Sequence, residues 1–205
     1  MNDDGDDPGY ESVRTTLESA LKPPFAVTFT SAQADDGKSA LAAGTARAFA
    51  AAGFRTILVD AHPGFPGVGA ALGIGELALP VTVDVQKLEP VGVAPNLTAA
   101  SIGSHKLVDG IAPATIQAFV QAVRAAHDVT IFDACDLFYE PVAMQCAAAC
   151  DGVVLAVRYA RNPDEDDARA VGALEKNGAR IIGSVTTSYP GPFARALRKI
   201  IQLPS

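Results

Sequence analysis

Short apolar runs alternate along the chain with stretches whose apolar residues recur every three or four positions. The runs are typical of buried strands and the periodic stretches of helices. We therefore predict strands over residues 25–30, 55–60, 97–102, 129–133, 152–158 and 179–186, and helices over residues 10–22, 38–52, 113–127, 141–150, 163–177 and 193–202. This alternation predicts an α/β fold, in which a doubly wound, mostly parallel sheet has helices on both faces.

The Gly- and Pro-rich stretch over residues 61–92 interrupts this pattern, and only one helical turn near residues 68–72 is expected there. With 205 residues, 49% of them hydrophobic, the chain can form one sizeable core. We expect a single domain over residues 10–205 after an acidic, flexible N-terminus over residues 1–9. The net charge of −7 argues against a nucleic-acid-binding protein, which needs a basic face.

No secretory signal and no uncharged apolar run of the roughly 20 residues that span a bilayer is present, so a cytoplasmic location is expected. The three cysteines, Cys135, Cys146 and Cys150, are then reduced. We interpret them as core residues, because no fourth metal ligand has suitable spacing.

The loop after the first predicted strand carries the most informative motif. Residues 32–39 read Ala-Gln-Ala-Asp-Asp-Gly-Lys-Ser, which departs from the phosphate-loop pattern GxxxxGK[ST] only at its first Gly. In such a loop backbone N–H groups surround the phosphates, the Lys reaches the outer phosphates and the hydroxyl binds Mg²⁺. A helix start that contains Gly-Lys-Ser by chance is the alternative. The strand before and the helix after favour a nucleotide site formed by Asp36, Gly37, Lys38, Ser39 and Ala40.

Two predicted strands end in a carboxylate, Asp60 and Asp133. The carboxyl ends of parallel strands form the ligand-binding edge of such a sheet, and a carboxylate there can hold Mg²⁺ directly or through water. Either Asp alone could be an ordinary turn residue. Together with the loop they predict a metal site made of Ser39, Asp60 and Asp133, and a catalytic set of Lys38 and the two carboxylates.

These motifs resemble those of the MinD/ParA-like P-loop ATPases, and within that superfamily those of the bacterial tyrosine kinases (BY-kinases) that regulate capsule and exopolysaccharide export. The similarity covers about residues 10–190. It includes the Walker A segment at residues 30–39, the Walker A′ strand at residues 57–60 and the Walker B strand at residues 130–133. It also includes the following core strand at residues 151–157 and the start of an N-terminal ExxRxxR motif at residues 11–14.

The resemblance implies ATP and Mg²⁺ as cofactors and self-association of the chain. It also implies a membrane-bound polysaccharide co-polymerase or export protein as partner, which would bring the chain to the inner face of the membrane. The function it implies is that of an ATP-binding regulator of exopolysaccharide or capsule synthesis or export.

Several positions depart from the BY-kinase pattern. His62 stands where the Walker A′ motif has a second Asp, and a neutral imidazole cannot supply that negative charge, so His62 is a doubtful catalytic residue. Asp35 replaces a loop Gly, and Leu17 replaces the last Arg of ExxRxxR. The tyrosine-rich C-terminal tail is missing, with only Tyr189 near that end. These departures predict a weak or inactive kinase.

Two other functions stay open at this point. One is a MinD/ParA-type ATPase that positions a cell-surface apparatus, and the other is a non-catalytic scaffold that has lost nucleotide binding. The last predicted helix is also open to two interpretations, because its apolar face is accompanied by basic residues. It could lie on an anionic membrane, but its short apolar stripe favours docking on the sheet or on a partner. The apolar residues are Phe193, Leu197, Ile200 and Ile201, and the basic ones Arg195, Arg198 and Lys199.

Overall fold

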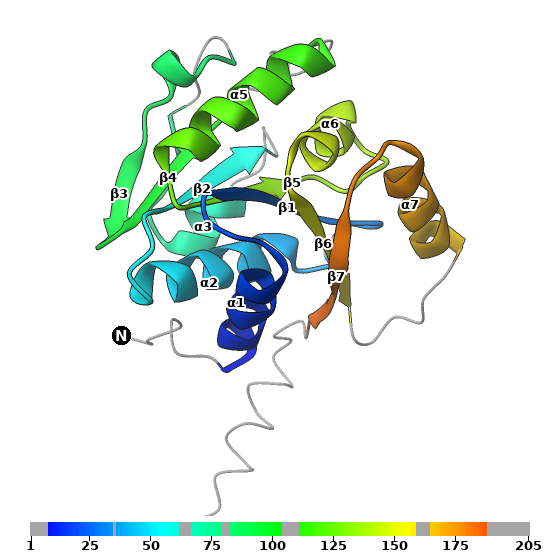
Figure 1. Ribbon diagram of the computed structural model, residues 1–205, viewed down its shortest axis with the longest axis horizontal. Helices are drawn as coiled ribbons and strands as arrows, with labels where there is room; N and C mark the ends of the chain where they lie inside the picture. Colours follow the sequence, from blue (N-terminus) through cyan, green and yellow to red (C-terminus); the bar gives the residue numbers. More distant parts are fainter. Residues whose placement is uncertain are drawn as a thin grey trace, which may run out of the picture.

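The computed structural model describes residues 8–34, 36–61, 67–78, 83–103, 111–158 and 165–187. In this part of the chain one seven-stranded sheet has the order β3-β4-β2-β5-β1-β6-β7 (Figure 1). All neighbouring strands pair in parallel except β3, which runs antiparallel to β4. The strands are β1 (Phe25–Ser31), β2 (Thr56–Ala61), β3 (Val91–Ala94), β4 (Leu97–Ser101), β5 (Val129–Ala134), β6 (Gly152–Arg158) and β7 (Ile181–Thr187).

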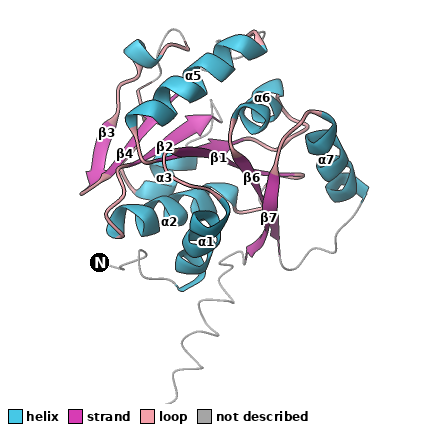
Figure 2. Ribbon diagram, in the orientation of Figure 1, coloured by secondary structure: helices cyan, strands magenta, loops and turns pink. Residues whose placement is uncertain are grey.

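Helices cover both faces of the sheet (Figure 2). One face carries α1 (Pro8–Ala20), α2 (Lys38–Ala51) and α3 (Gly67–Leu72), and the other carries α5 (Pro113–Ala126), α6 (Pro141–Ala149) and α7 (Glu165–Lys176), while the 3₁₀-helix η2 (Val85–Lys87) contacts α5. Each face has its own apolar layer, because successive strand residues point to opposite sides. On β2, for example, Ile57 and Val59 join the layer under α5, whereas Leu58 joins the layer under α2.

The predicted fold class is confirmed, and the predicted elements that fall in the described residues are all present. Their ends differ by one or two residues, as helix and strand boundaries commonly do. The helix predicted from Tyr10 begins at Pro8, a residue that is well tolerated in the first turn. The helix predicted over residues 193–202 lies outside the described residues.

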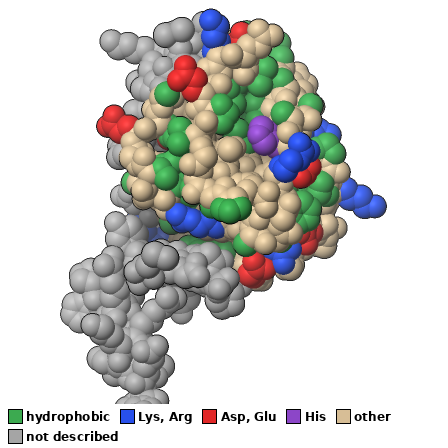
Figure 3. Space-filling view, turned by 90° about the vertical axis from the view of Figure 1, so that its left-hand side faces the viewer, with side chains coloured by type: hydrophobic (Ala, Val, Ile, Leu, Met, Phe, Trp, Pro, Cys, Tyr) green, Lys and Arg blue, Asp and Glu red, His purple; other side chains and the backbone are tan. Residues whose placement is uncertain are grey.

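Strand β3 was not predicted, because its four residues lie in the Gly- and Pro-rich stretch. It forms a hairpin with β4 through a turn at Pro95 and Asn96, and Asn96 has a φ of 61°, a left-handed conformation that Asn tolerates. The Pro-Asn pair between two short apolar runs was the available signal. Strand β3 is an exposed edge, with Val91 42% exposed, and Figure 3 shows acidic and basic side chains interspersed on this side of the molecule.

The cysteines pack in the protein interior, as predicted. Cys135 and Cys146 are buried in the layer under α5 and α6, and Cys150 packs against it while accepting a hydrogen bond from the Thr28 hydroxyl at 3.2 Å. Burial raises the pKa of Cys135 and of Cys150 to about 12 and that of Cys146 well above its ordinary value. The described residues contain no cluster of metal-ligating side chains of three or more His, Cys, Asp or Glu.

None of the helices in the described ranges is both long enough and apolar enough to cross a membrane.

Candidate functional site

The carboxyl ends of neighbouring strands bring the two predicted carboxylates together. In the sheet register Asp60 is paired with Asp133, and Ser101 with Asp60. Register partners on parallel strands point to the same face and lie about 4.8 Å apart. Leu58 and Ile131, two residues earlier on the same strands, belong to the layer under α2. Asp60 and Asp133 therefore face the side of the sheet on which α2 begins.

The predicted phosphate loop connects β1 to α2 at this same edge. Gly37 has φ 78° and ψ 16°, a left-handed conformation that an L side chain adopts only with strain, and α2 starts at the next residue. Lys38 is 6% exposed and Asp36 1%, whereas Ser39 is half-buried and the Ala40 side chain faces solvent. The loop thus presents a helix N-terminus and a lysine to the strand ends, an arrangement suited to phosphate.

Asp133 is the most unusual group at the site. It is fully buried, and neither of its carboxylate oxygens has a hydrogen-bond partner of good geometry among the described residues. Burial raises its pKa to about 6, and the nearby Ser39 hydroxyl and Lys38 ammonium only partly oppose that shift. A buried carboxylate with so little compensation is costly, and a cation bound beside it would offset that cost.

Gly67, the first residue of α3, closes over this carboxylate. A methyl group built on Gly67 would lie 3.0 Å from Ser39 Oγ and 3.3 Å from Asp133 Oδ2. The absence of a side chain here leaves a small space between a hydroxyl and a carboxylate. Oxygen ligands of this kind are those that Mg²⁺ prefers, and the unpartnered oxygens of Asp133 supply the charge it requires. The residues present therefore fit a bound Mg²⁺.

The end of β7 holds the phosphate loop from the other side. The Thr187 hydroxyl donates a hydrogen bond to the backbone carbonyl of Asp36, and a Cβ on Gly37 would lie 3.1 Å from Thr187 Oγ1. The sequence prediction overlooked both Thr187 and Gly67. A hydroxyl residue at the end of a strand was the only signal for Thr187, and Gly67 carried none, because its role depends on which side chains it approaches.

We expect Thr187→Val to lower the free energy of unfolding by about 1 kcal/mol, because it leaves the Asp36 carbonyl without this donor while keeping the shape of the side chain. Urea denaturation of the two proteins measures the difference. Thr186→Val, one position earlier on the same strand and exposed, is the matched control and should change stability little. Equal effects of the two substitutions would show that the hydrogen bond contributes nothing to the fold.

The structure brings Lys38, Ser39 and Asp133 together, with Asp60 beside Asp133 in the sheet. Asp36 and Gly37 form the end of the loop, while Ala40 contributes only its backbone on this side. Two of the predicted positions, His62 and Asp35, lie outside the described residues.

On α1, the partial ExxRxxR motif is engaged within its own helix. Arg14 pairs with Glu11 at 2.8 Å and with Glu18 at 2.7 Å, and these pairs raise the pKa of the Arg14 guanidinium. Leu17, which stands in place of the last Arg, is 1% exposed and packs in the layer under α2. A Leu in place of the motif's last Arg therefore contributes to the hydrophobic core.

Comparisons with known proteins bear on the identity of this site. No protein-family model matches the sequence. Over 194 residues the chain is 24% identical to the tyrosine-protein kinase CpsD of Streptococcus agalactiae, an alignment that covers 86% of this chain and 80% of that one. Over 148 residues it is 28% identical to the succinoglycan biosynthesis transport protein ExoP of Rhizobium meliloti. This alignment covers 67% of this chain and 19% of ExoP.

Solved structures share the fold. The kinase domain of the Escherichia coli tyrosine kinase ETK superposes with a TM-score of 0.71 at 13% identity, covering 89% of this chain and 76% of that one. The septum site-determining protein MinD of Pyrococcus horikoshii, complexed with Mg-ADP, gives a TM-score of 0.64 at 15% identity, covering 88% and 78%. The chain thus has the MinD/ParA-like P-loop fold that BY-kinase domains share, and its sequence relatives are CpsD- and ExoP-type proteins.

Proposed function

We propose that the chain is an ATP- and Mg²⁺-binding regulator of capsule or exopolysaccharide synthesis or export, with weak or no tyrosine-kinase activity. The observation that carries the nucleotide part is Asp133, a fully buried carboxylate beside Ser39 and Lys38 whose oxygens have no hydrogen-bond partner of good geometry in the part of the chain that the structure describes. A fold that had no use for this charge would be more stable with an apolar residue there. A divalent cation on a nucleotide is the partner that explains it.

Each residue has a part to play in that complex. The backbone N–H groups of residues 36–40, at the start of α2, bind the phosphates, and Lys38 neutralises the outer ones. Ser39, Asp60 and Asp133 hold Mg²⁺ directly or through water. When bound, the metal ion neutralises phosphate charge and fixes the orientation of the nucleotide.

A reduced kinase activity is supported by the second Walker A′ position and by the distribution of tyrosines. His62 occupies the position at which the resemblance expects a carboxylate, so one negative charge near the metal is missing. Among the described tyrosines, Tyr139 is 59% exposed and Tyr10 packs against Gly44 of α2. They do not form the tyrosine cluster expected of an autokinase.

The polysaccharide part of the proposal comes from the relatives. CpsD is named as a tyrosine-protein kinase and ExoP as a biosynthesis transport protein for succinoglycan. We infer that this chain acts with a membrane-bound polysaccharide co-polymerase or export protein, and that this partner brings it to the inner face of the membrane. Self-association through a surface other than the incomplete ExxRxxR motif belongs to the same proposal.

Calorimetric titration of Mg²⁺-ATP into the purified protein tests the nucleotide site. We expect binding by the parent and its loss in Lys38→Ala, because the lysine supplies the charge opposite the outer phosphates. Lys22→Ala is the matched control, since Lys22 is exposed and lies after α1, and it should bind as the parent does. An absence of binding in a folded parent would overturn the nucleotide assignment and leave the scaffold interpretation. Equal binding by all three proteins would overturn the phosphate-loop assignment instead, because the nucleotide would then bind without Lys38.

Phosphotyrosine detection after incubation with Mg²⁺-ATP then tests the kinase part. We expect little or no signal from a parent that binds ATP. A strong signal that disappears in Lys38→Ala would instead show an active kinase.

A further inference from the structure

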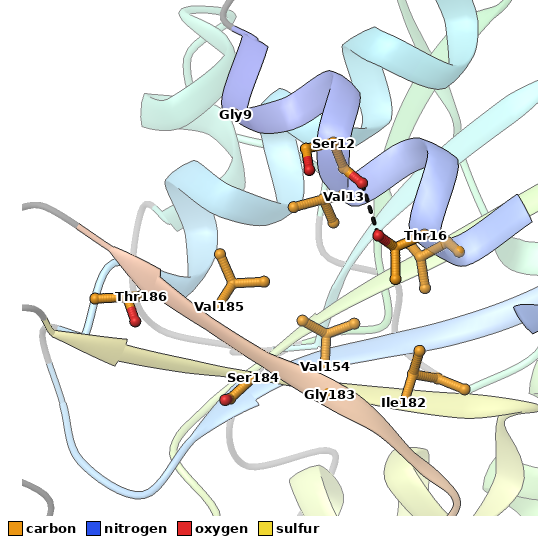
Figure 4. Close-up of a pocket in the computed structure, with 11 residues that line it drawn as sticks. Gly9, Ser12, Val13, Thr16, Val154, Ile182, Gly183, Ser184, Val185 and Thr186 are labelled. Carbon is orange, nitrogen blue, oxygen red and sulfur yellow. Dashed lines mark hydrogen bonds between the residues drawn. The ribbon is translucent and has the colours of Figure 1, made fainter. Parts of the chain in front are cut away.

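A groove of about 360 Å³ lies between α1 and the β6–β7 edge of the sheet (Figure 4). Its floor is apolar and its rim carries glycines and hydroxyl side chains. The floor consists of Val13, Leu17, Val154, Ile182 and Val185, and the rim of Gly9, Ser12, Thr16, Gly183, Ser184 and Thr186. Small rim residues of this kind let another element approach closely.

An irregularity in β7 creates the apolar floor. The pairing of β6 with β7 passes from Val153–Ile181 to Val154–Gly183, so Ile182 is an extra residue on β7. Such a bulge changes the side to which the following side chains point. Ile181 therefore packs in the layer under α7, whereas Ile182 and Val185 both face α1. Without the bulge these two side chains would lie on opposite faces of the sheet.

The chain itself leaves the described structure at the wall of this groove. Strand β7 ends at Thr187, one residue beyond Thr186 on the rim, and 18 residues follow. The first of them contain Pro190, Gly191 and Pro192, residues that suit a change of direction. A segment that turns back at this point would run along β7 toward Ile182.

The lengths agree with such a return. The five groove residues of β7 span about 13 Å. A helix from Phe193 to Ile201 spans about 12 Å, and so does the groove part of α1 from Gly9 to Leu17. In Figure 4 Gly9 and Thr186 lie at one end of the groove and Thr16 and Ile182 at the other, so a helix entering beside Thr186 would run parallel to α1.

The C-terminal segment carries Arg195, Arg198 and Lys199 beside its apolar residues. A short apolar stripe with only three basic residues is a weak membrane anchor, which favours docking on the protein over binding to a membrane.

We propose that residues 188–205 fold back as a helix into the groove between α1 and β7, placing Phe193, Leu197, Ile200 and Ile201 against its floor. The docked segment covers the β7 edge and joins the layer formed by α1. This inference does not depend on nucleotide binding, so its test uses the full chain without ATP.

Hydrogen–deuterium exchange compares the parent with Leu197→Gln and with Lys199→Gln as the matched control. Leu197 lies in the middle of the apolar face, and Lys199 lies on the opposite side of the same helix. We expect amides of α1 and β7 to exchange at least tenfold faster in Leu197→Gln than in the other two proteins. Equal exchange in all three would overturn the proposal.

Cross-linking identifies the occupant of the groove. A Thr16→Cys/Ile200→Cys protein treated with a short bismaleimide is expected to give an intramolecular product as a monomer. The natural thiols should react little, since Cys135 and Cys146 are buried, Cys150 is partly buried and all three have raised pKa values. A cross-linked dimer would overturn the proposal in favour of a second copy. Sedimentation of the parent, but not of Leu197→Gln, with phosphatidylglycerol vesicles would overturn it in favour of a membrane.

Discussion

Asp133→Asn is expected to stabilise the nucleotide-free protein at pH 7 and to abolish its Mg²⁺-dependent binding of ATP. In the parent a charged carboxylate is held in the interior, where the nearby Ser39 hydroxyl and Lys38 ammonium only partly replace the lost hydration, and this costs free energy of folding. A shift of the pKa from 3.8 to about 6 corresponds to a cost on the order of 3 kcal/mol above pH 6. The amide of Asn is also buried and keeps part of this cost, so we expect Asp133→Asn to raise the free energy of unfolding by about 1–2 kcal/mol.

The pH dependence has a definite sign. Because the folded protein holds the Asp133 proton up to about pH 6 and the unfolded chain releases it near pH 4, the folded state binds more protons between these values. The contribution of Asp133 to the free energy of unfolding therefore falls as the pH rises from 4 through 6. Asp133→Asn lacks this component, so its advantage over the parent should shrink when both are measured at pH 4.

Urea denaturation at pH 4 and pH 7, with and without Mg²⁺-ATP, measures these effects. Asp128→Asn is the control, because Asp128 is paired with Arg55 at 2.7 Å and the pairing lowers its pKa. That substitution should not stabilise the protein. Mg²⁺-ATP is expected to stabilise the parent and leave Asp133→Asn unchanged. A variant less stable than the parent at pH 7 would show that the carboxylate has a partner in the nucleotide-free protein.

Gly67→Val is expected to reduce the affinity for Mg²⁺-ATP at least tenfold, about 1.4 kcal/mol, while every predicted ligand remains in place. The first carbon of the new side chain would already lie 3.0 Å from Ser39 Oγ and 3.3 Å from Asp133 Oδ2, closer than ordinary carbon–oxygen contacts. The two methyl groups beyond it would fill the space that the metal requires. The effect is steric and should persist at all pH values.

Ala70→Val, on the same short helix but exposed, controls for the cost of a β-branched residue in α3. Calorimetric titration of both variants with Mg²⁺-ATP, together with their urea midpoints, separates a binding effect from unfolding. If Gly67→Val bound Mg²⁺-ATP as tightly as Ala70→Val, the metal would have to lie elsewhere.

Much of the fold could be predicted from local patterns. Continuously apolar strands such as β1 and β5 indicated a sheet buried on both faces, and the periodic stretches indicated its helices. The loop before Lys38 and the Asp at the ends of two strands predicted a site at one edge of the sheet, and the structure brings these residues together at that edge. Strand β3 escaped prediction because an exposed edge has little apolar pattern, and its existence depends on pairing with β4.

The sequence by itself determined which residue types stand at the carboxyl ends of the strands, because strand ends follow from apolar runs and a phosphate loop from its glycine and lysine. Only the tertiary structure decided how those residues meet. It placed Asp60 beside Asp133 in register, buried Asp133 completely, and brought Gly67 and Thr187 against the loop. These contacts join segments far apart in the chain. Burial and distance, which set the charge state of Asp133 and the room for a metal, arise only when the segments pack together.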